Sequence, residues 1–542
     1  MRQVYLLTID QYLYMDSDIN LRYINYKTKL AILSAIIFFV VTFLFGQVYP
    51  HHTDAAIHVL RSQWILEHGW FPYDEYAFDQ KDFYVYPPVF HILGAVSKLI
   101  FDTYLVVPAA AGASSVLMTY VLVAIWYNRS IALATSIVLS LNPFFILWSA
   151  RMYVGTTITA GFLLTMVLYS IYNKKKEKKY LYFAFLAGGS LSAVKTYGPA
   201  IVGIILFHYL WVHRESLTEA AKSITLPLAS AIIVSLPWPI RNAILTGSPV
   251  PKVYGRPIET GVGGNPADSG GNGHEILSLL NEVHAFFLRA LGVYPAPEFL
   301  MQLREIHILL LILSLVMPII IIYIMMVGIR NNKINAIWWI WIGTFALLYT
   351  IQRVVGGSGF KYRHFITLTP VFCLMFVLGY RHISINYNLK RLLGLLLAGA
   401  LLIQMGGVAA QQTVYYETAW DPATDWVEQN VEHDEVIYYH RTPRNFAFRV
   451  DSAYKFITTT EKEGYVHPSE NFSEVISDRA DYVIINDAAL AGEKAKVKIA
   501  SKSGVINKIK TIDIKQPIKI KDTTIYQVDR KWSIYKTKGT SN

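Results

Sequence analysis

The sequence contains few charged residues and almost no cysteine. Asp, Glu, Lys and Arg make up 16% of the 542 residues, while apolar residues make up 53%. Long uninterrupted runs of Leu, Ile, Val and Phe account for this imbalance, which is typical of a polytopic membrane protein. The single cysteine, Cys373, lies inside an apolar run, so no disulfide bond can form within the chain.

The formal net charge of +11 does not indicate a nucleic-acid partner. The basic residues cluster in short loops between apolar runs, as expected of cytoplasmic loops that face anionic lipid. The partner that these charges predict is the lipid bilayer. The first apolar run begins near residue 30 and lacks a small-residue cleavage site, so we interpret it as a retained span rather than a signal peptide.

We expect about eleven transmembrane helices in a multi-pass plasma-membrane protein with a cytoplasmic N-terminus. Five lysines between residues 174 and 179 set this orientation, because they belong on the inner side. The apolar run at 85–101 would place them outside if it crossed, so we predict a non-spanning or re-entrant helix there. The predicted spans cover residues 30–48, 104–126, 131–148, 155–172, 180–194, 196–211, 224–240, 306–328, 335–351, 365–378 and 392–409. The third of these, 131–148, is interrupted by Asn142 and Pro143.

Two domains follow from this division of the chain. The membrane domain, 1–410, contains a long first outer loop at 49–103 and a second long outer loop at 241–305. The tail, 411–542, is charged and has no apolar run long enough to span, which predicts a small extracytoplasmic α/β domain. Within the tail we expect a short helix at 425–431 and strands at 435–439, 482–485 and 525–528.

The first outer loop holds the densest group of Asp, Glu, His and aromatic residues. If Asp54 begins a helix, the 3.6-residue period places Asp54, His58 and Arg61 on one face and apolar residues on another. We expect this amphipathic helix to lie on the bilayer and to end at Gly69.

A second group of acidic residues in this loop precedes the rigid proline pair at residues 87 and 88. Asp74 and Glu75 lie there among Tyr and Phe residues. Aromatic faces with interleaved carboxylates suit a sugar, because its rings stack and its hydroxyl groups need hydrogen-bond acceptors.

Several motifs together resemble the glycosyltransferase C superfamily. They are ILEHGWFP at 65–72, YPP at 86–88 and PWPIRNAILTGSPVP at 237–251, with an early Asp after the first span. The superfamily includes protein O-mannosyltransferases, the lipid A aminoarabinose transferase and the catalytic subunit of oligosaccharyltransferase. The resemblance implies two membrane-parallel helices in the first outer loop. It also implies a sugar donor carried on a polyprenyl phosphate and used on the outer side of the membrane.

Asp54 matches the position of the essential acidic residue of that superfamily. Transfer to a hydroxyl group needs a base that takes the acceptor proton, and a fixed carboxylate can do so. The alternative is a helix N-cap, for which Asp is also preferred. We expect His58, Asp74 and Glu75 to contact the substrates.

Cations at the predicted outer boundary of the membrane are candidates for binding the phosphate that leaves during sugar transfer. The leaving phosphate is an anion, and fixed positive charge and hydrogen-bond donors ease its departure. The candidates for phosphate binding could alternatively be interfacial residues that snorkel to the membrane surface. These candidates are Lys195, Arg241, Lys361, Arg363 and His364.

A metal site is not assigned. The segment 149–155 resembles one that carries an Asp or Glu shortly after its Arg in the superfamily, but no acid follows Arg151 here. A hard cation needs several oxygen ligands. The residues identify no cofactor, and a divalent cation stays open.

The predicted function is transfer of a sugar from a dolichyl-phosphate-type donor to an extracytoplasmic protein, glycan or lipid, by inverting single displacement with Asp54 as base. We expect a hexosyltransferase or mannosyltransferase. An oligosaccharyltransferase-like enzyme is the nearest alternative, although the tail has no WWDYG-like motif. A lipid transporter would show inverted repeats, which we do not find. A non-catalytic subunit would fit the acid missing after Arg151.

Overall fold

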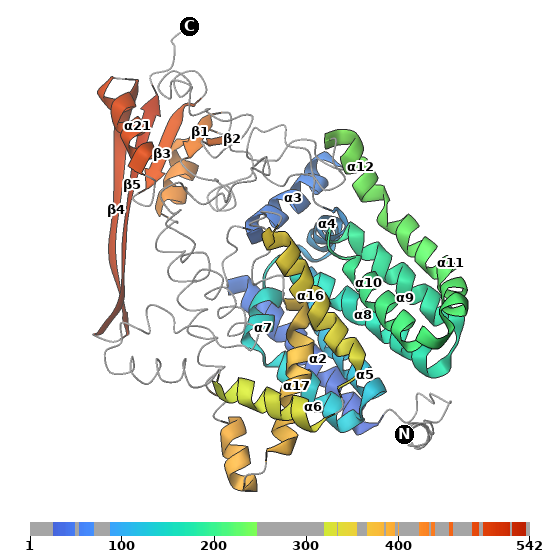
Figure 1. Cartoon of the computed structure of the whole chain (residues 1–542). Coiled ribbons are helices and arrows are strands. Elements are labelled where there is room, and N and C mark those ends of the chain that lie inside the picture. Colours follow the sequence, from blue (N-terminus) through green and yellow to red (C-terminus); the bar gives the residue numbers. More distant parts are fainter. Residues whose placement is uncertain are drawn as a thin grey trace.

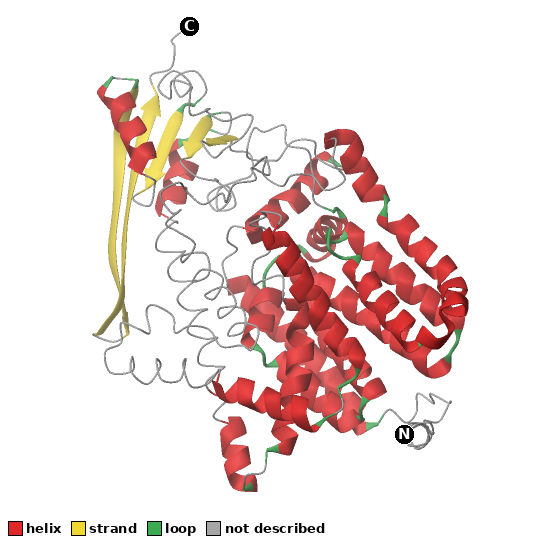
Figure 2. Cartoon of the chain, viewed as in Figure 1, coloured by secondary structure: helices red, strands yellow, loops and turns green. Residues whose placement is uncertain are grey.

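The computed structural model describes a mostly helical chain with one β-sheet near its C-terminus (Figure 2). The described residues are 25–48, 54–69, 87–246, 319–332, 334–354, 366–383, 386–395, 399, 422–432, 435–439, 455–458, 480–486, 491–503, 505–520 and 523–537.

Four helices in the described part are long and apolar enough to cross a membrane, or up to five if each bent pair is one span. The four are α2 (Tyr26–Val48), α5 (Val106–Trp126), α8 (Val154–Lys175) and α11 (Leu217–Ser235). With about 1.5 Å of rise per residue, 19 to 23 helical residues cover the roughly 30 Å of hydrocarbon. The chain is therefore a multi-pass membrane protein, as its composition predicts.

The fifth candidate span is a broken helix. Its parts, α6 (Arg129–Ser140) and α7 (Pro143–Ser149), meet at an angle of 62°. Pro143 cannot continue α6 but suits the first turn of α7, where its missing N–H is not needed. The Asn142 side-chain oxygen accepts a hydrogen bond from the Phe145 N–H at 3.0 Å and so caps the new helix. This confirms the interruption predicted at these residues.

Shorter helices complete the described bundle. They are α9 (Lys178–Ser190), η2 (Leu191–Ala193), α10 (Ala200–Val212), η3 (Arg214–Ser216), α12 (Pro237–Thr246), α16 (Ala336–Val354), α17 (Thr369–His382) and a helix at Ile319–Asn331. The span predicted at 224–240 is wrong at its end, because α11 stops at Ser235 and Pro237 begins α12. Most of the span predicted at 392–409 lies outside the described residues, so the total of eleven stays a prediction.

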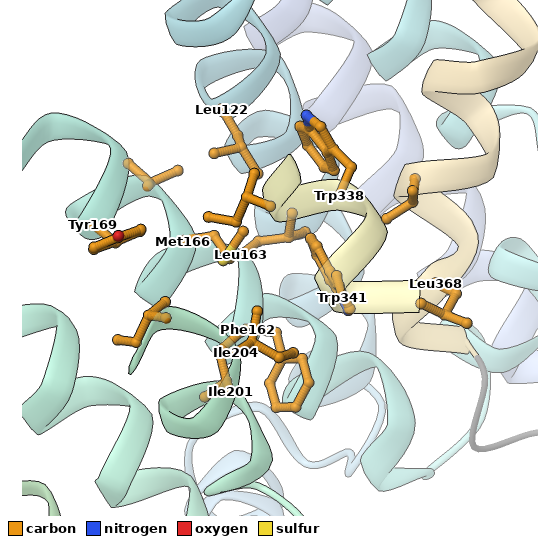
Figure 3. Packing of buried hydrophobic residues seen from close by; sticks show 14 of the residues in the cluster. Leu122, Phe162, Leu163, Met166, Tyr169, Ile201, Ile204, Trp338, Trp341 and Leu368 are labelled. Atoms are coloured by element: carbon orange, nitrogen blue, oxygen red, sulfur yellow. The ribbon is translucent and has the colours of Figure 1, made fainter. Parts of the chain in front are cut away.

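The core lies where α5, α8, α10, α16 and α17 converge. Phe162 from α8 is fully buried, and Trp338 and Trp341 from α16 are at most 1% exposed. The two indole rings stack with centroids 5.9 Å apart. Figure 3 shows these side chains meeting leucine and isoleucine side chains from the neighbouring helices. This packing holds α8 and α10, and the segments that precede these helices carry residues of the candidate site.

Two helices of the first outer loop pack against this bundle (Figure 1). The helix α3 (Asp54–His68) begins at Asp54 and ends before Gly69, whose φ of +81° is left-handed, so the predicted bounds are confirmed. The helix α4 (Val89–Phe101) has 13 residues, or about 20 Å, which is shorter than the hydrocarbon core. Its apolar side, with Leu99 and Phe101, is exposed, while His91 and Gly94 are buried on the other side.

The C-terminal part contains a five-stranded sheet of order β2-β1-β3-β5-β4. The strands are β1 (Val436–Tyr439), β2 (Lys455–Thr458), β3 (Tyr482–Asn486), β4 (Ile506–Ile520) and β5 (Thr523–Thr537). β1 is parallel to β2 and β3, and β5 is antiparallel to β3 and β4. The helix α21 (Ala491–Lys502) packs on the sheet, and a further helix covers 422–430. The predicted helix and three strands are present, and the side of the membrane stays a prediction.

Candidate functional site

The polar face of α3 is buried in the protein. His58 is 5% exposed, Arg61 6% and Ser62 0%, although long polar side chains normally stay in contact with water. The helix α4 covers this face, and Gly94 makes the close approach possible. A β-carbon at Gly94 would overlap the Ser62 hydroxyl and the end of the Met152 side chain. The sequence therefore places a polar stripe of α3 against α4 rather than against solvent.

His58 and His91 form a buried pair between these helices. His58 Nδ1 lies 2.7 Å from His91 Nε2, and the two imidazole rings are 5.0 Å apart between centroids. The Phe90 ring meets the His58 ring edge to face at 5.3 Å. Each histidine lies on a regular helix, so the pair is held by packing on both sides.

Cations surround the histidine pair. Burial, Arg61 and Lys195 lower the pKa of His91 well below its ordinary value of 6.5, in that order of importance, while a hydrogen bond to the Pro87 carbonyl opposes them. Arg61 comes from α3, and Lys195 comes from the turn between η2 and α10. Two segments that are far apart in sequence thus place positive charge around the neutral imidazole of a third, α4.

A fourth segment, residues 148–153, packs beside the His58 ring. The Tyr153 ring lies 6.2 Å from the His58 ring and 4.5 Å from the Trp148 ring. The Arg151 guanidinium lies over Trp148 at 5.2 Å, and Arg151 is 6% exposed. This segment directly precedes α8, so the site lies at the N-terminal end of that helix.

The lysine cluster lies at the other end of α8. Lys174 and Lys175 form its last turn, Lys176 caps it, and Lys178 begins α9. Twenty-two helical residues separate the two ends by about 33 Å. The histidine pair and the lysine cluster therefore lie near opposite ends of a membrane-crossing helix.

Comparison with solved structures identifies this arrangement. ArnT from Cupriavidus metallidurans in the apo state has a TM-score of 0.58 to this chain at 11% identity, covering 94% of this chain and 98% of ArnT. ArnT bound to undecaprenyl phosphate gives a TM-score of 0.54 with the same identity and coverage. The chain therefore has the fold of ArnT. The fold that the resemblance implies is thereby confirmed.

Other comparisons add little to this likeness in fold. An oligosaccharyltransferase from Archaeoglobus fulgidus matches 83% of this chain and 67% of its own at 14% identity, with a TM-score of 0.46. No protein-family model and no curated protein sequence matches the chain.

The structure brings two of the predicted site residues together. His58 and Lys195 both lie around His91. Asp54 is the first residue of α3, one turn before His58 and on the same face. Arg241 lies within α12, not in a loop, with its guanidinium 4.5 Å from the Trp238 ring.

The other predicted residues lie outside the described part of the chain, and the site contains two residues that the sequence did not predict. Five predicted residues lie outside the described part of the chain, namely Asp74, Glu75, Lys361, Arg363 and His364. The sequence analysis assigned no role to Arg61, which shares the face of Asp54, and did not include His91 in the site. The YPP motif, which fixes the start of α4, is the signal that could have placed His91 near the site.

Within the described residues, no three His, Cys, Asp or Glu side chains gather as metal ligands. The charged side chains that act on His91 in that part of the chain are those of Arg61 and Lys195, and their positive charge favours binding of an anion over a cation. The arrangement suits binding of a phosphate group.

Proposed function

We propose that this chain is a membrane glycosyltransferase that moves a sugar from a polyprenyl-phosphate donor to an extracytoplasmic acceptor. The observation that carries the proposal is the group of Arg61, Lys195 and the histidine pair, at the end of the bundle opposite the lysine cluster. The glycosyltransferase C fold supports it, because ArnT, which has this fold, binds undecaprenyl phosphate.

The charges suit the leaving group of such a reaction. When the bond between sugar C1 and the phosphate oxygen breaks, the phosphate gains negative charge. Cations fixed before the reaction stabilise this charge without reorganising, and their effect is strong where water is excluded. Arg61 and Lys195 come from α3 and the η2–α10 turn, which are held by the packed bundle.

Asp54 is the proposed base. The carboxylate takes the proton of the acceptor hydroxyl as the hydroxyl oxygen attacks C1 from the face opposite the phosphate. A single displacement of this kind inverts the configuration at C1. The position of Asp54 at the start of α3, one turn before His58, supports this role.

Several finer assignments are proposals of the same rank. Asp74 and Glu75 would contact sugar hydroxyl groups, and Arg241 would contact the donor from α12. Lys361, Arg363 and His364 would contact the donor phosphate. The hexosyl or mannosyl nature of the sugar and the outer location of 411–542 belong with them.

The decisive experiment is sugar transfer by the purified protein from a labelled polyprenyl-phosphate donor. We expect Asp54→Asn to abolish release of polyprenyl phosphate while donor binding stays intact. Asp102→Asn is the matched control, because Asp102 ends α4 with its side chain 92% exposed. A fully active Asp54→Asn protein would remove the base from the mechanism. Transfer measured with and without chelator tests a requirement for a divalent cation.

A further inference from the structure

The histidine pair has a defined hydrogen-bond direction. His91 Nε2 faces His58, so Nδ1 is the nitrogen that donates to the Pro87 carbonyl. A neutral imidazole with its proton on Nδ1 has a lone pair on Nε2. His58 Nδ1–H therefore donates to His91 Nε2, and a neutral His58 carries its lone pair on Nε2, where the ring can be protonated.

The surroundings keep His91, the hydrogen-bond acceptor of the pair, neutral at rest. The described charged or titratable groups around it are Arg61 from α3, Lys195 from the turn before α10, and Tyr153 from the segment before α8. Burial and the two cations hold the pKa of His91 well below 6.5. An anion bound beside these cations acts in the opposite direction, because it favours an imidazolium ion.

We propose that the His58–His91 pair receives the proton lost by the sugar acceptor and holds it while the leaving phosphate occupies the site. This inference rests on the proposed function and deepens it. His58 is the group that takes the proton, from Asp54 one helical turn away. His91 is a positioning residue, which sets the tautomer of His58 from α4.

The reaction balances in atoms and charge. The bond from C1 to the phosphate oxygen breaks, with its electron pair left on the phosphate, and the bond from C1 to the acceptor oxygen forms. The acceptor proton passes to Asp54 and then to His58 Nε2. The phosphate changes from a monoanion to a dianion while the pair changes from neutral to singly positive. The total charge of the site is thus unchanged during transfer.

The pair suits this task better than a single histidine. When His58 carries a proton on both nitrogens, its Nδ1–H still donates to His91 Nε2 at 2.7 Å. Protonation therefore breaks no hydrogen bond between α3 and α4. A hydrogen bond to the charged form also stabilises that form.

The test is calorimetric binding of undecaprenyl phosphate, the leaving group in this reaction, to the full chain in detergent. Titrations in buffers of different ionisation enthalpy give the number of protons taken up per lipid bound. They are made between about pH 6.5 and 8.5, where a phosphate monoester with a second pKa of about 6 is mainly a dianion. Comparison with His91→Gln at each pH cancels the titration of the phosphate itself.

We expect the wild-type protein to take up more protons per lipid than His91→Gln or His58→Gln, with a difference that approaches one. Both variants should still bind the lipid through Arg61 and Lys195. The matched control is His208→Gln, because His208 is also buried and bonds the Tyr169 hydroxyl at 2.8 Å, at residues of α10 and α8 away from the site. It should retain the wild-type uptake.

The outcomes separate this inference from the proposed function. Lipid binding with the same proton uptake in wild type, His58→Gln and His91→Gln overturns the inference and leaves the transferase proposal standing. Absence of lipid binding by the wild type overturns both. Should one histidine variant fail to fold, the other and the wild-type uptake answer the same question.

Discussion

Substitution of Gly94 by alanine tests the packing that builds the site. A β-carbon there would overlap the Ser62 hydroxyl and Met152 Cε, and it would lie 3.1 Å from Ser62 Cβ. Ser62 and Met152 are both fully buried, so neither has room to move away. Overpacking of this kind costs about 1 to 3 kcal/mol, which outweighs the roughly 1 kcal/mol that alanine gains over glycine within a helix.

The functional effect should exceed the loss of stability. His91 lies three residues before Gly94 on the same buried side of α4. Moving α4 away from α3 by a few tenths of an ångström lengthens the 2.7 Å contact between His58 and His91. We therefore expect Gly94→Ala to lower both the melting temperature and the rate of sugar transfer.

The assay compares Gly94→Ala with Gly203→Ala by thermal unfolding in detergent and by donor-dependent transfer. Gly203 lies in α10 and nothing lies within 4 Å of the position of its added β-carbon. Gly203→Ala should leave activity unchanged and stability equal or higher. Equal stability and equal activity of the two variants would refute the close approach of α3 and α4 at Gly94.

Three further predictions concern charge and packing. Lys195→Met should weaken undecaprenyl phosphate binding by about 10- to 100-fold, because it removes a charge-assisted hydrogen bond of about 1.5 to 3 kcal/mol. The control is Lys390→Met, which should not weaken binding, since the Lys390 ammonium lies over the Tyr380 ring. Equal affinities of the two variants would contradict the role of Lys195. Because the pKa of His91 is lowered, the folded state binds fewer protons than the unfolded state, and stability should fall as the pH drops below the ordinary pKa of 6.5. His91→Gln should flatten this pH dependence in unfolding curves. An unchanged slope in the variant would argue against a buried neutral His91. Gly379→Ala should decrease the unfolding free energy by an amount near the upper end of the usual cost of overpacking, about 1 to 3 kcal/mol, because the added β-carbon would overlap the Ile324 backbone carbonyl. A melting temperature equal to that of wild type would refute this helix crossing.

The sequence predicted the parts of the fold that depend on local signals. The break at Asn142 and Pro143 follows from the chemistry of one helix cap, and α3 ends where Gly69 supplies a left-handed residue. The end of α11 was missed because an apolar run continues through Pro237 without a change in composition. Hydropathy reports the environment of a segment, whereas proline decides where its hydrogen bonding stops.

The site was only partly accessible from sequence for a different reason. The spacing of Asp54, His58 and Arg61 is a property of one helix and could be read directly. The contact between His58 and His91 joins residues 33 positions apart, and it depends on the angle at which α4 crosses α3. That crossing is set by Gly94 and Met152, which carry no chemical signal of their own.

The contrast between the two ends of the bundle favours one orientation in the membrane. At the lysine end, cations lie over aromatic rings near the surface, as with Lys179 at 5.2 Å from Tyr180 and Arg214 at 5.4 Å from Trp211. At the other end, Arg61 and Arg151 are each 6% exposed. Exposed cations suit the anionic headgroups of an inner leaflet, whereas burial of two guanidinium groups is costly and is expected only where a specific partner compensates it. This contrast supports the proposed orientation, in which the lysine end faces the cytoplasm and the histidine pair lies towards the outer face.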